Sequence, residues 1–261
     1  MMHDSQTQTE FLTDSAETTG GKVIVIKNLQ KKFGSQEVLK NVSLDLFKEE
    51  NLVVLGKSGS GKSVLIKCIV GLLFPDKGEI NVLGKNVLSL NQNELNELRK
   101  KIGFLFQSSA LYDSMTVKQN LEFPLKRIYK KLSQEETDNK VNEALENVGL
   151  ADALHKMPSW LSGGMRKRIG LARTIIVDPQ IMLYDEPTTG LDPITSNEIS
   201  QLINEVQKKY HTSSIIITHD LPCARTTANR VMMLKDGEVY ANGTLKELEN
   251  SSDEWIKSFF K

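Results

Sequence analysis

The fold of this 261-residue chain is decided by the stretch Gly56-Lys57-Ser58-Gly59-Ser60-Gly61-Lys62-Ser63. It matches in full the phosphate-loop pattern GxxxxGK followed by Ser or Thr, between a β-rich apolar run at 51–55 and a helical pattern that starts at Lys62. Glycines let backbone N–H groups curl around an anion, and a helix N-terminus adds partial positive charge. We therefore expect Lys62 to bridge the β- and γ-phosphates of a nucleotide, and the Ser63 hydroxyl to ligate magnesium.

Two carboxylates, Asp185 and Glu186, follow the apolar strand pattern Ile181 to Tyr184. At the edge of the sheet, Asp185 would orient the magnesium shell and Glu186 would face the attacking water as general base. A solvated acidic strand end is the ordinary alternative. This alternative is less favoured because the two carboxylates are followed immediately by Pro187-Thr188-Thr189-Gly190-Leu191-Asp192.

Two further polar residues end strand patterns. Gln107 follows 102–106 and can offer its amide oxygen to magnesium or water, while His219 follows 214–218 and can hydrogen-bond a terminal phosphate. Alone, such residues are more often a surface amide and a structural histidine. Their order relative to the carboxylates favours a functional role for both.

A second phosphate-binding surface is indicated by Leu161-Ser162-Gly163-Gly164-Met165, because Ser-Gly-Gly opens a helix. One nucleotide rarely needs two such surfaces. The simplest geometry therefore closes this surface over a nucleotide held by another copy of the chain.

Charge and composition exclude several classes of protein. Lys plus Arg and Asp plus Glu both total 33, so no net field favours nucleic acid as a partner. Cys68 and Cys223 lack metal-ligand spacing and are expected to be reduced packing residues in a cytosolic compartment. No stretch approaches the roughly 20 apolar residues of a membrane helix. Residues 1–21 lack the pattern of a secretion signal and are expected to be a disordered tail.

Hydrophobic periodicity predicts alternating strands and helices, with turns and short apolar pieces at 112–131 where an inserted lobe begins. Ser133, with Glu136 three residues on, predicts a helix N-terminus. Strands are predicted at 22–26, 42–46, 51–55, 102–106, 181–184 and 214–218; helices from Lys62, from Ser133 to Gly149, from Gly163 to Asp178 and at 194–209; and a hairpin turn at Asp236-Gly237.

In this order the motifs resemble those of ATP-binding-cassette (ABC) ATPases: Walker A, Q-loop, signature, Walker B, D-loop and switch histidine. The resemblance spans residue 23 to about 245. It implies that Phe33 stacks on adenine, that Ser162, Gly163 and Gly164 contact the γ-phosphate of a partner's ATP, and that Asp192 ties the two sites together. The ATP-binding set it implies is Phe33, Gly56, Lys57, Ser58, Gly59, Ser60, Gly61, Lys62, Ser63, Val64 and Gln107, with Mg²⁺ on Ser63, Gln107 and Asp185.

The fold class expected from the phosphate loop and this resemblance is an α/β P-loop NTPase core with an N-terminal antiparallel β subdomain and an inserted helical subdomain. The ABC ATPase domain would cover 22–245, with the helical subdomain at about 108–173. The tail at 1–21 precedes it, and a C-terminal docking helix at 246–261 follows it.

Within the family, three stretches look like the ATPase of Mla-type transporters, which move phospholipid between bacterial membranes with a permease and an MCE lipid-binding protein. They are 161–168, 61–64 and 184–193; the segment 106–117 adds to this resemblance. Met165 departs from the family's usual Gln, yet leaves Ser162 and the glycine N–H groups in place, so catalysis is expected to survive. Arg166-Lys167-Arg168 is interpreted as a solvated helix face in preference to a lipid-headgroup contact.

Two copies are thus expected to sandwich two ATP molecules and to drive an integral-membrane permease from the cytoplasmic face of the inner membrane, with an MCE-type protein as a further partner. Two alternatives stay open. One is an ABC ATPase for another cargo, such as an amino-acid importer or a lipoprotein-release system. The other is a soluble non-transport ABC ATPase of translation or DNA repair, which the single cassette, the lack of coiled coils and the zero net charge disfavour.

Overall fold

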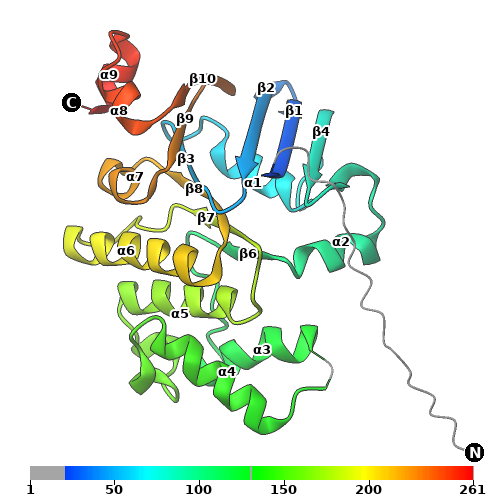
Figure 1. Cartoon of the computed structure of the whole chain (residues 1–261), viewed down its shortest axis with the longest axis vertical. Helices are drawn as coiled ribbons and strands as arrows, with labels where there is room; N and C mark the ends of the chain where they lie inside the picture. The colour runs from blue at the N-terminus through cyan, green and yellow to red at the C-terminus, as the bar shows by residue number, and fades with distance from the viewer. Residues whose placement is uncertain (1–20, 130, 261) are drawn as a thin grey trace, which may run out of the picture.

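The computed structural model describes residues 21–129 and 131–260 and contains two β-sheets (Figure 1). The larger sheet has the strand order β10-β9-β3-β8-β7-β6, and every neighbouring pair is parallel except β10 with β9. Its strands are β3 (Asn51–Leu55), β6 (Ile102–Leu105), β7 (Ile181–Asp185), β8 (Ser213–Thr218), β9 (Arg230–Lys235) and β10 (Glu238–Gly243). Parallel strands end at one edge, so the loops after β3, β6, β7 and β8 converge there. The tail expected at 1–21 lies outside the described residues except for Gly21.

The smaller sheet is antiparallel and has the order β2-β1-β4-β5. Its strands are β1 (Lys22–Phe33), β2 (Gln36–Phe47), β4 (Lys77–Val82) and β5 (Lys85–Asn86). The strands predicted at 22–26 and 42–46 are parts of β1 and β2, which run much longer. The register between β1 and β2 shifts at several points along β1, and most of the shifts lie beyond Ile26, where they interrupt the two-residue alternation on which the prediction relied.

Helix α1 (Lys62–Ile69) packs between the two sheets, where it contacts β2, β7 and β8. One buried apolar cluster joins its Leu65, Ile66 and Ile69 to both sheets. Helix α2 (Gln92–Arg99) packs on β6 at the border of this cluster. The phosphate loop is therefore fixed at both ends by buried elements.

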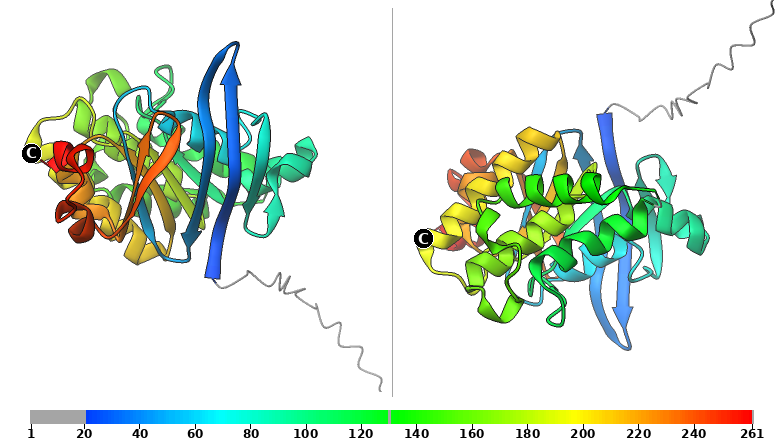
Figure 2. Two further views of the ribbon diagram at one scale, coloured as in Figure 1. Left: turned by 90° about the horizontal axis from the view of Figure 1, so that it is seen from above. Right: turned by 90° about the horizontal axis from the view of Figure 1, so that it is seen from below.

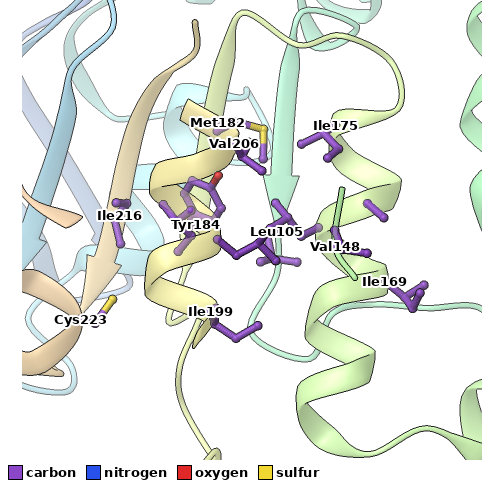
Figure 3. Close-up of a cluster of buried hydrophobic side chains, with 14 of the residues drawn as sticks. Leu105, Val148, Ile169, Ile175, Met182, Tyr184, Ile199, Val206, Ile216 and Cys223 are labelled. Atoms are coloured by element: carbon purple, nitrogen blue, oxygen red, sulfur yellow. The ribbon is translucent and has the colours of Figure 1, made fainter. Parts of the chain in front are cut away.

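The other face of the larger sheet is covered by helices, which Figure 2 shows from below. These are α5 (Gly163–Ile175), α6 (Pro193–Tyr210) and α7 (Leu221–Thr227), and α3 (Val117–Ile128) and α4 (Gln134–Glu146) pack on α5. Short 3-10 turns η3 (Ala151–Ala153) and η4 (Pro158–Trp160) precede α5, whereas η2 (Val87–Ser89) precedes α2 and contacts β4 of the smaller sheet. Tyr184 and Leu105 of the sheet lie in the same buried cluster as Ile169 of α5 and Ile199 of α6 (Figure 3). This packing joins the helical region to the strands that end at the site.

Two helical segments differ from the prediction. The turn-rich stretch at 112–131 contains α3, in which Pro124 obscured the pattern although Thr116 and Gln119 form a capping box. The single docking helix expected at 246–261 is instead two short helices, α8 (Leu245–Glu249) and α9 (Glu254–Phe260). They are separated by 250–253, where the Asp253 carboxylate accepts hydrogen bonds from the backbone N–H groups of residues 255 and 256 and starts a new helix.

Within residues 21–129 and 131–260, none of the helices has both the length and the apolar character required to span a bilayer.

Candidate nucleotide site

A cavity of about 300 Å³ lies where the carboxyl ends of the parallel strands meet the N-terminus of α1. It is lined by Val38, Ser58, Gly59, Gly61, Lys62, Ser63, Val64, Gln107, Glu186 and His219. Four separate loops contribute, and each follows a different strand of the larger sheet, with Val38 added from β2. The structure thus brings together the phosphate loop, Gln107, Glu186 and His219, as the sequence predicted.

The glycines of the phosphate loop are required by its close packing. Gly61 has φ 102°, and a Cβ there would lie 2.8 Å from both Val38 O and Leu39 Cδ2. A Cβ on Gly56 would lie 2.5 Å from Leu234 O. Gly61 is also the N-cap of α1 and provides no side-chain acceptor, so the first N–H groups of the helix remain available to an anion.

Lys62 lies at the base of the cavity and is almost fully buried. Its Nζ donates to the carbonyl oxygens of Gly56 at 2.7 Å and Lys57 at 3.2 Å, and lies 3.7 Å from Glu186 Oε1. Burial lowers the pKa of Lys62, and the carboxylates of Glu186 and Asp185 oppose that shift. An anionic phosphate is a natural further partner for this buried ammonium group.

The Ser63 hydroxyl donates to Asp185 Oδ1 at 2.9 Å, which joins the start of α1 to the end of β7. A hydroxyl, a carboxylate and the nearby Gln107 amide are hard oxygen donors that suit Mg²⁺. No cluster of three or more His, Cys, Asp or Glu side chains suited to a metal occurs in the described part of the chain. The donor set fits a metal that takes its remaining ligands from water and phosphate.

Glu186 is held in an unusual backbone conformation, with φ 50°. Its N–H donates to Ile217 O of β8 at 2.9 Å, and its Oε2 atom accepts a hydrogen bond from Thr189 Oγ1 at 3.2 Å and lies 2.8 Å from His219 Nδ1. A positive φ at a non-glycine residue costs energy and persists where surrounding contacts enforce it. The carboxylate is therefore aimed into the cavity by the sheet and by two side chains.

The interpretation of Arg166-Lys167-Arg168 as a solvated helix face is wrong for Lys167, whereas Arg166 is exposed. Lys167 is 5% exposed, and its Nζ donates to Gln107 O at 2.5 Å and to Glu186 O at 3.2 Å. Arg166 and Arg168 donate to the carbonyl oxygens of Leu161 and Val148. Burial lowers the pKa of Lys167 to about 8, opposed by Asp185 and Glu186. The helical spacing of α5 could have indicated an inward Lys167, because Gly163, Gly170 and Lys167 share one side of the helix.

The Ser-Gly-Gly surface lies outside this cavity, at the N-terminus of α5. Ser162 is the N-cap, and its Oγ accepts a hydrogen bond from Met165 N at 3.2 Å. Gly163 and Gly164 face Leu191 and Thr195 of the loop and helix that follow β7. Asp192 caps α6 and accepts a hydrogen bond from Thr195 Oγ1 at 2.6 Å.

Some residues of the expected ATP-binding set stand apart from the cavity wall. Phe33, at the end of β1, is 47% exposed, and Lys31 Nζ lies 5.4 Å from the centre of its ring. Lys57 and Ser60 line a neighbouring hollow of about 310 Å³ next to Trp255. Val38 of β2 also lines the cavity, although it lies outside the strand predicted at 42–46 and no sequence pattern singled it out.

The family model described as ABC transporter matches residues 39–189, which contain the phosphate loop, Gln107, the Ser-Gly-Gly surface and both carboxylates. The chain belongs to the ABC transporter family. It is the ATP-binding subunit of an ABC transporter and an ATPase.

Among relatives of this ABC ATPase is the probable ribonucleotide transport ATP-binding protein mkl of Mycobacterium leprae (strain TN). The two are 40% identical over 92% of this chain and 69% of that protein. The methionine import ATP-binding protein MetN of Clostridium tetani is 37% identical over 87% of this chain and 70% of that protein. The chain spans 66% of the length of the mkl protein of Mycobacterium tuberculosis (strain ATCC 25618 / H37Rv).

Two solved structures share the ABC ATPase fold. A dimeric post-hydrolysis state of the ATP-binding cassette MJ0796, bound to ADP and Pi, gives a TM-score of 0.79 at 34% identity over 85% of this chain and 98% of that chain. The structure of cbiO1 from Clostridium perfringens, part of the ABC transporter complex cbiONQ, gives 0.81 at 28% identity over 92% and 96%. The expected α/β core with its antiparallel sheet and helical elements is confirmed.

Proposed function

We propose that two copies of this chain enclose two ATP molecules and hydrolyse them in order to drive phospholipid transport through a membrane permease. The observation that carries the hydrolytic part is the convergence of Lys62, His219 and Thr189 on one carboxylate, that of Glu186, whose side chain is 12% exposed. General-base catalysis needs a carboxylate aimed at the attacking water, with neighbours that fix its direction.

In this proposal the phosphates lie over the phosphate loop, from Gly56 to Val64. Lys62 exchanges its carbonyl partners for β- and γ-phosphate oxygens, and Phe33 stacks on adenine beside the loop. Ser63, Asp185 and Gln107 would hold Mg²⁺, and the metal would neutralise charge on the phosphates. Glu186 accepts a proton from water, and His219 orients the Glu186 carboxylate and hydrogen-bonds the terminal phosphate.

The second surface completes the site from another copy. Ser162, Gly163 and Gly164 are at the exposed start of α5 and outside the cavity of their own chain, which suits contact with a partner's γ-phosphate. Asp192 joins this surface to the loop after β7 by capping α6. The dimeric state of the related cassette bound to ADP and Pi supports an arrangement of this kind.

An apolar groove on this chain offers a surface to which a permease can bind. This groove of about 190 Å³ is lined by Val70, Leu72, Arg99, Ile102, Phe104 and Phe106, and Leu72 and Phe74 are about half exposed beside it. Phe106 directly precedes Gln107, so a segment bound in the groove adjoins the nucleotide site. The helical region at about 108–173 would move with it. Contact with a permease places the subunit on the cytoplasmic face of the inner membrane.

Phospholipid as cargo, with an MCE-type lipid-binding protein as partner, rests on the likeness of 161–168, 61–64 and 184–193 to Mla-type ATPases. The methionine import protein, at 37% identity, favours a second candidate, an importer of small solutes. The two are separated by purifying the transporter with its neighbouring gene products and measuring ATP-dependent transfer of labelled phospholipid between liposomes. Transfer that needs ATP and Glu186 supports the proposal, whereas turnover stimulated by an amino acid with no lipid transfer contradicts it.

A further inference from the structure

Three residues on one side of helix α5, Lys167, Gly170 and Arg173, contact the segment that follows β6. Lys167 donates to Gln107 O at 2.5 Å, and Arg173 donates to Ser109 O at 3.0 Å and Ala110 O at 2.8 Å. Between them, a Cβ on Gly170 would lie 3.0 Å from Ser109 Cβ and 3.4 Å from Ser109 O, so glycine lets the helix approach the segment closely. Residues three apart share one face of a helix. The path of the Gln107 segment is therefore set by α5.

The same helix reaches the backbone of Glu186 through Lys167. Its Nζ also donates to the backbone oxygen of Glu186 at 3.2 Å, on the residue held at φ 50°. A buried ammonium group must be satisfied by acceptors, and its two partners here are the carbonyl oxygens of Gln107 and Glu186. One side chain thus connects α5, the Gln107 segment and the peptide that orients the base.

The first residue of this connection is Ser162, the N-cap of α5, five positions before Lys167. A continuous helix transmits a displacement of its N-terminus to residues one turn further along. Under the proposed function, Ser162 contacts the nucleotide of the partner subunit. The position of the N-terminus of α5 then depends on the partner's nucleotide. Lys167 is the residue of α5 through which this dependence reaches the subunit's own site.

We propose that Lys167 is a positioning residue that couples the two ATP sites, aligning Gln107 and Glu186 of its own subunit when α5 engages the nucleotide of the partner. The inference rests on the proposed dimer but not on the cargo. Lys167 touches no substrate in this scheme. It acts through two backbone carbonyls, so its removal should slow hydrolysis while ATP binding to the phosphate loop is retained.

The test compares four forms of the full chain: native, Lys167→Met, Lys167→Arg and Arg168→Met. Methionine keeps the length of the side chain without its donors, and arginine restores donors and charge. Arg168→Met is the matched control, since Arg168 on the same helix also makes two hydrogen bonds, to Val148 O and Glu198, away from the site. For each form one measures kcat, KM, the Hill coefficient for ATP, the ATP dissociation constant and the melting temperature.

Lys167→Met is expected to lower kcat about tenfold or more and to move the Hill coefficient toward one, with ATP affinity within about twofold of native. Lys167→Arg should recover most of the rate, and Arg168→Met should stay within about twofold of native. Native kcat and cooperativity in a folded Lys167→Met variant would overturn the proposal, as would equal losses in Arg168→Met. If Lys167→Met does not fold, Lys167→Gln, which keeps a shorter donor, is judged by the same criteria.

Failure of the dimer itself is separated by ATP-dependent dimerisation in a Glu186→Gln background. With Lys167 native, absence of an ATP-dependent dimer contradicts the proposed function. A dimer that forms with native Lys167 but not with Lys167→Met contradicts this inference alone, because Lys167 would then support association and not alignment of the base.

Discussion

The Nδ1 atom of His219 lies 2.8 Å from Oε2 of Glu186, although the two residues are 33 positions apart in the chain. Glu186 directly follows β7 and His219 directly follows β8, and these two parallel strands are neighbours in the sheet. Their contact is therefore a product of sheet register. A change that weakens the contact between His219 and Glu186 is therefore expected to alter the orientation of the Glu186 carboxylate more than its charge.

Glu186→Gln should lower the ATP hydrolysis rate about 10² to 10⁴-fold, because an amide cannot accept the proton of water. ATP binding should persist, since Lys62 and the phosphate loop are unchanged. Size-exclusion chromatography with ATP should then show a long-lived dimer. Native turnover in this variant would remove Glu186 from the role of base.

His219→Ala should lower kcat about tenfold or more with little change in melting temperature, because His219 is about half exposed and its contact is with Glu186. His211→Ala is the matched control. That histidine is also exposed and also faces a carboxylate, Glu49, but far from the cavity. Steady-state ATPase rates should separate the two variants, and similar losses in both would contradict a specific role for His219.

Ser162→Tyr should abolish most hydrolysis by the dimer while a single chain still binds ATP. Ser133→Tyr controls for the loss of an N-cap, because Ser133 caps α4 as Ser162 caps α5. Each variant should lose about 1 kcal/mol of folding stability, but only Ser162→Tyr should lose activity. Full activity of the Ser162→Tyr variant would contradict the two-copy site. Hydrolysis at full rate in a strictly monomeric sample of the native chain would contradict it as well.

Gly164→Ala should destabilise the fold by about 1–3 kcal/mol, because the added Cβ would lie 2.5 Å from Thr195 Cγ2. Thr195→Ser removes that methyl group and keeps the hydroxyl that donates to Asp192. Adding it to Gly164→Ala should recover most of the melting temperature. If the double variant is no more stable than the single one, the clash lies elsewhere.

Both cysteines should be unreactive toward thiol reagents in the native state. Cys68 and Cys223 are buried, and burial raises the pKa of each thiol to about 11. Both folded pKa values lie above the ordinary 9.0, so the folded chain keeps these protons longer than the unfolded chain. Their contribution to stability is present below pH 9 and lost as pH rises toward 11. Titration with a disulfide reagent should find both thiols only after denaturation.

The chain order of the motifs was sufficient to predict the cavity. Glycine spacing and apolar strands located Lys62, Ser63, Glu186 and His219, because strand, turn and helix signals are local and these residues end strands. In contrast, Lys167 was misassigned, since a charged triplet on a helix is ordinarily solvated and its two acceptors lie 60 and 19 residues away. Nothing local in the sequence specifies such distant carbonyl groups.

The same limit explains the missed strands and the short C-terminal helices. β4 pairs with β1 across about fifty residues, and its pattern is cut by Gly78, whose close contact with Asn28 O and Lys27 O exists only in the folded sheet. The break between α8 and α9 depends on Asp253, which also accepts a hydrogen bond from Tyr240. These boundaries are set by contacts between distant segments and not by propensity.

Strand β3 lies between β8 and β9, so both of its hydrogen-bonded neighbours are synthesised more than 150 residues after it. During translation this fully buried strand, Asn51–Leu55, emerges from the ribosome with neither edge covered. This apolar segment therefore cannot pair with both of its neighbouring strands until residue 235 has been synthesised. Premature termination anywhere before that point should yield an aggregation-prone fragment and not a smaller working enzyme.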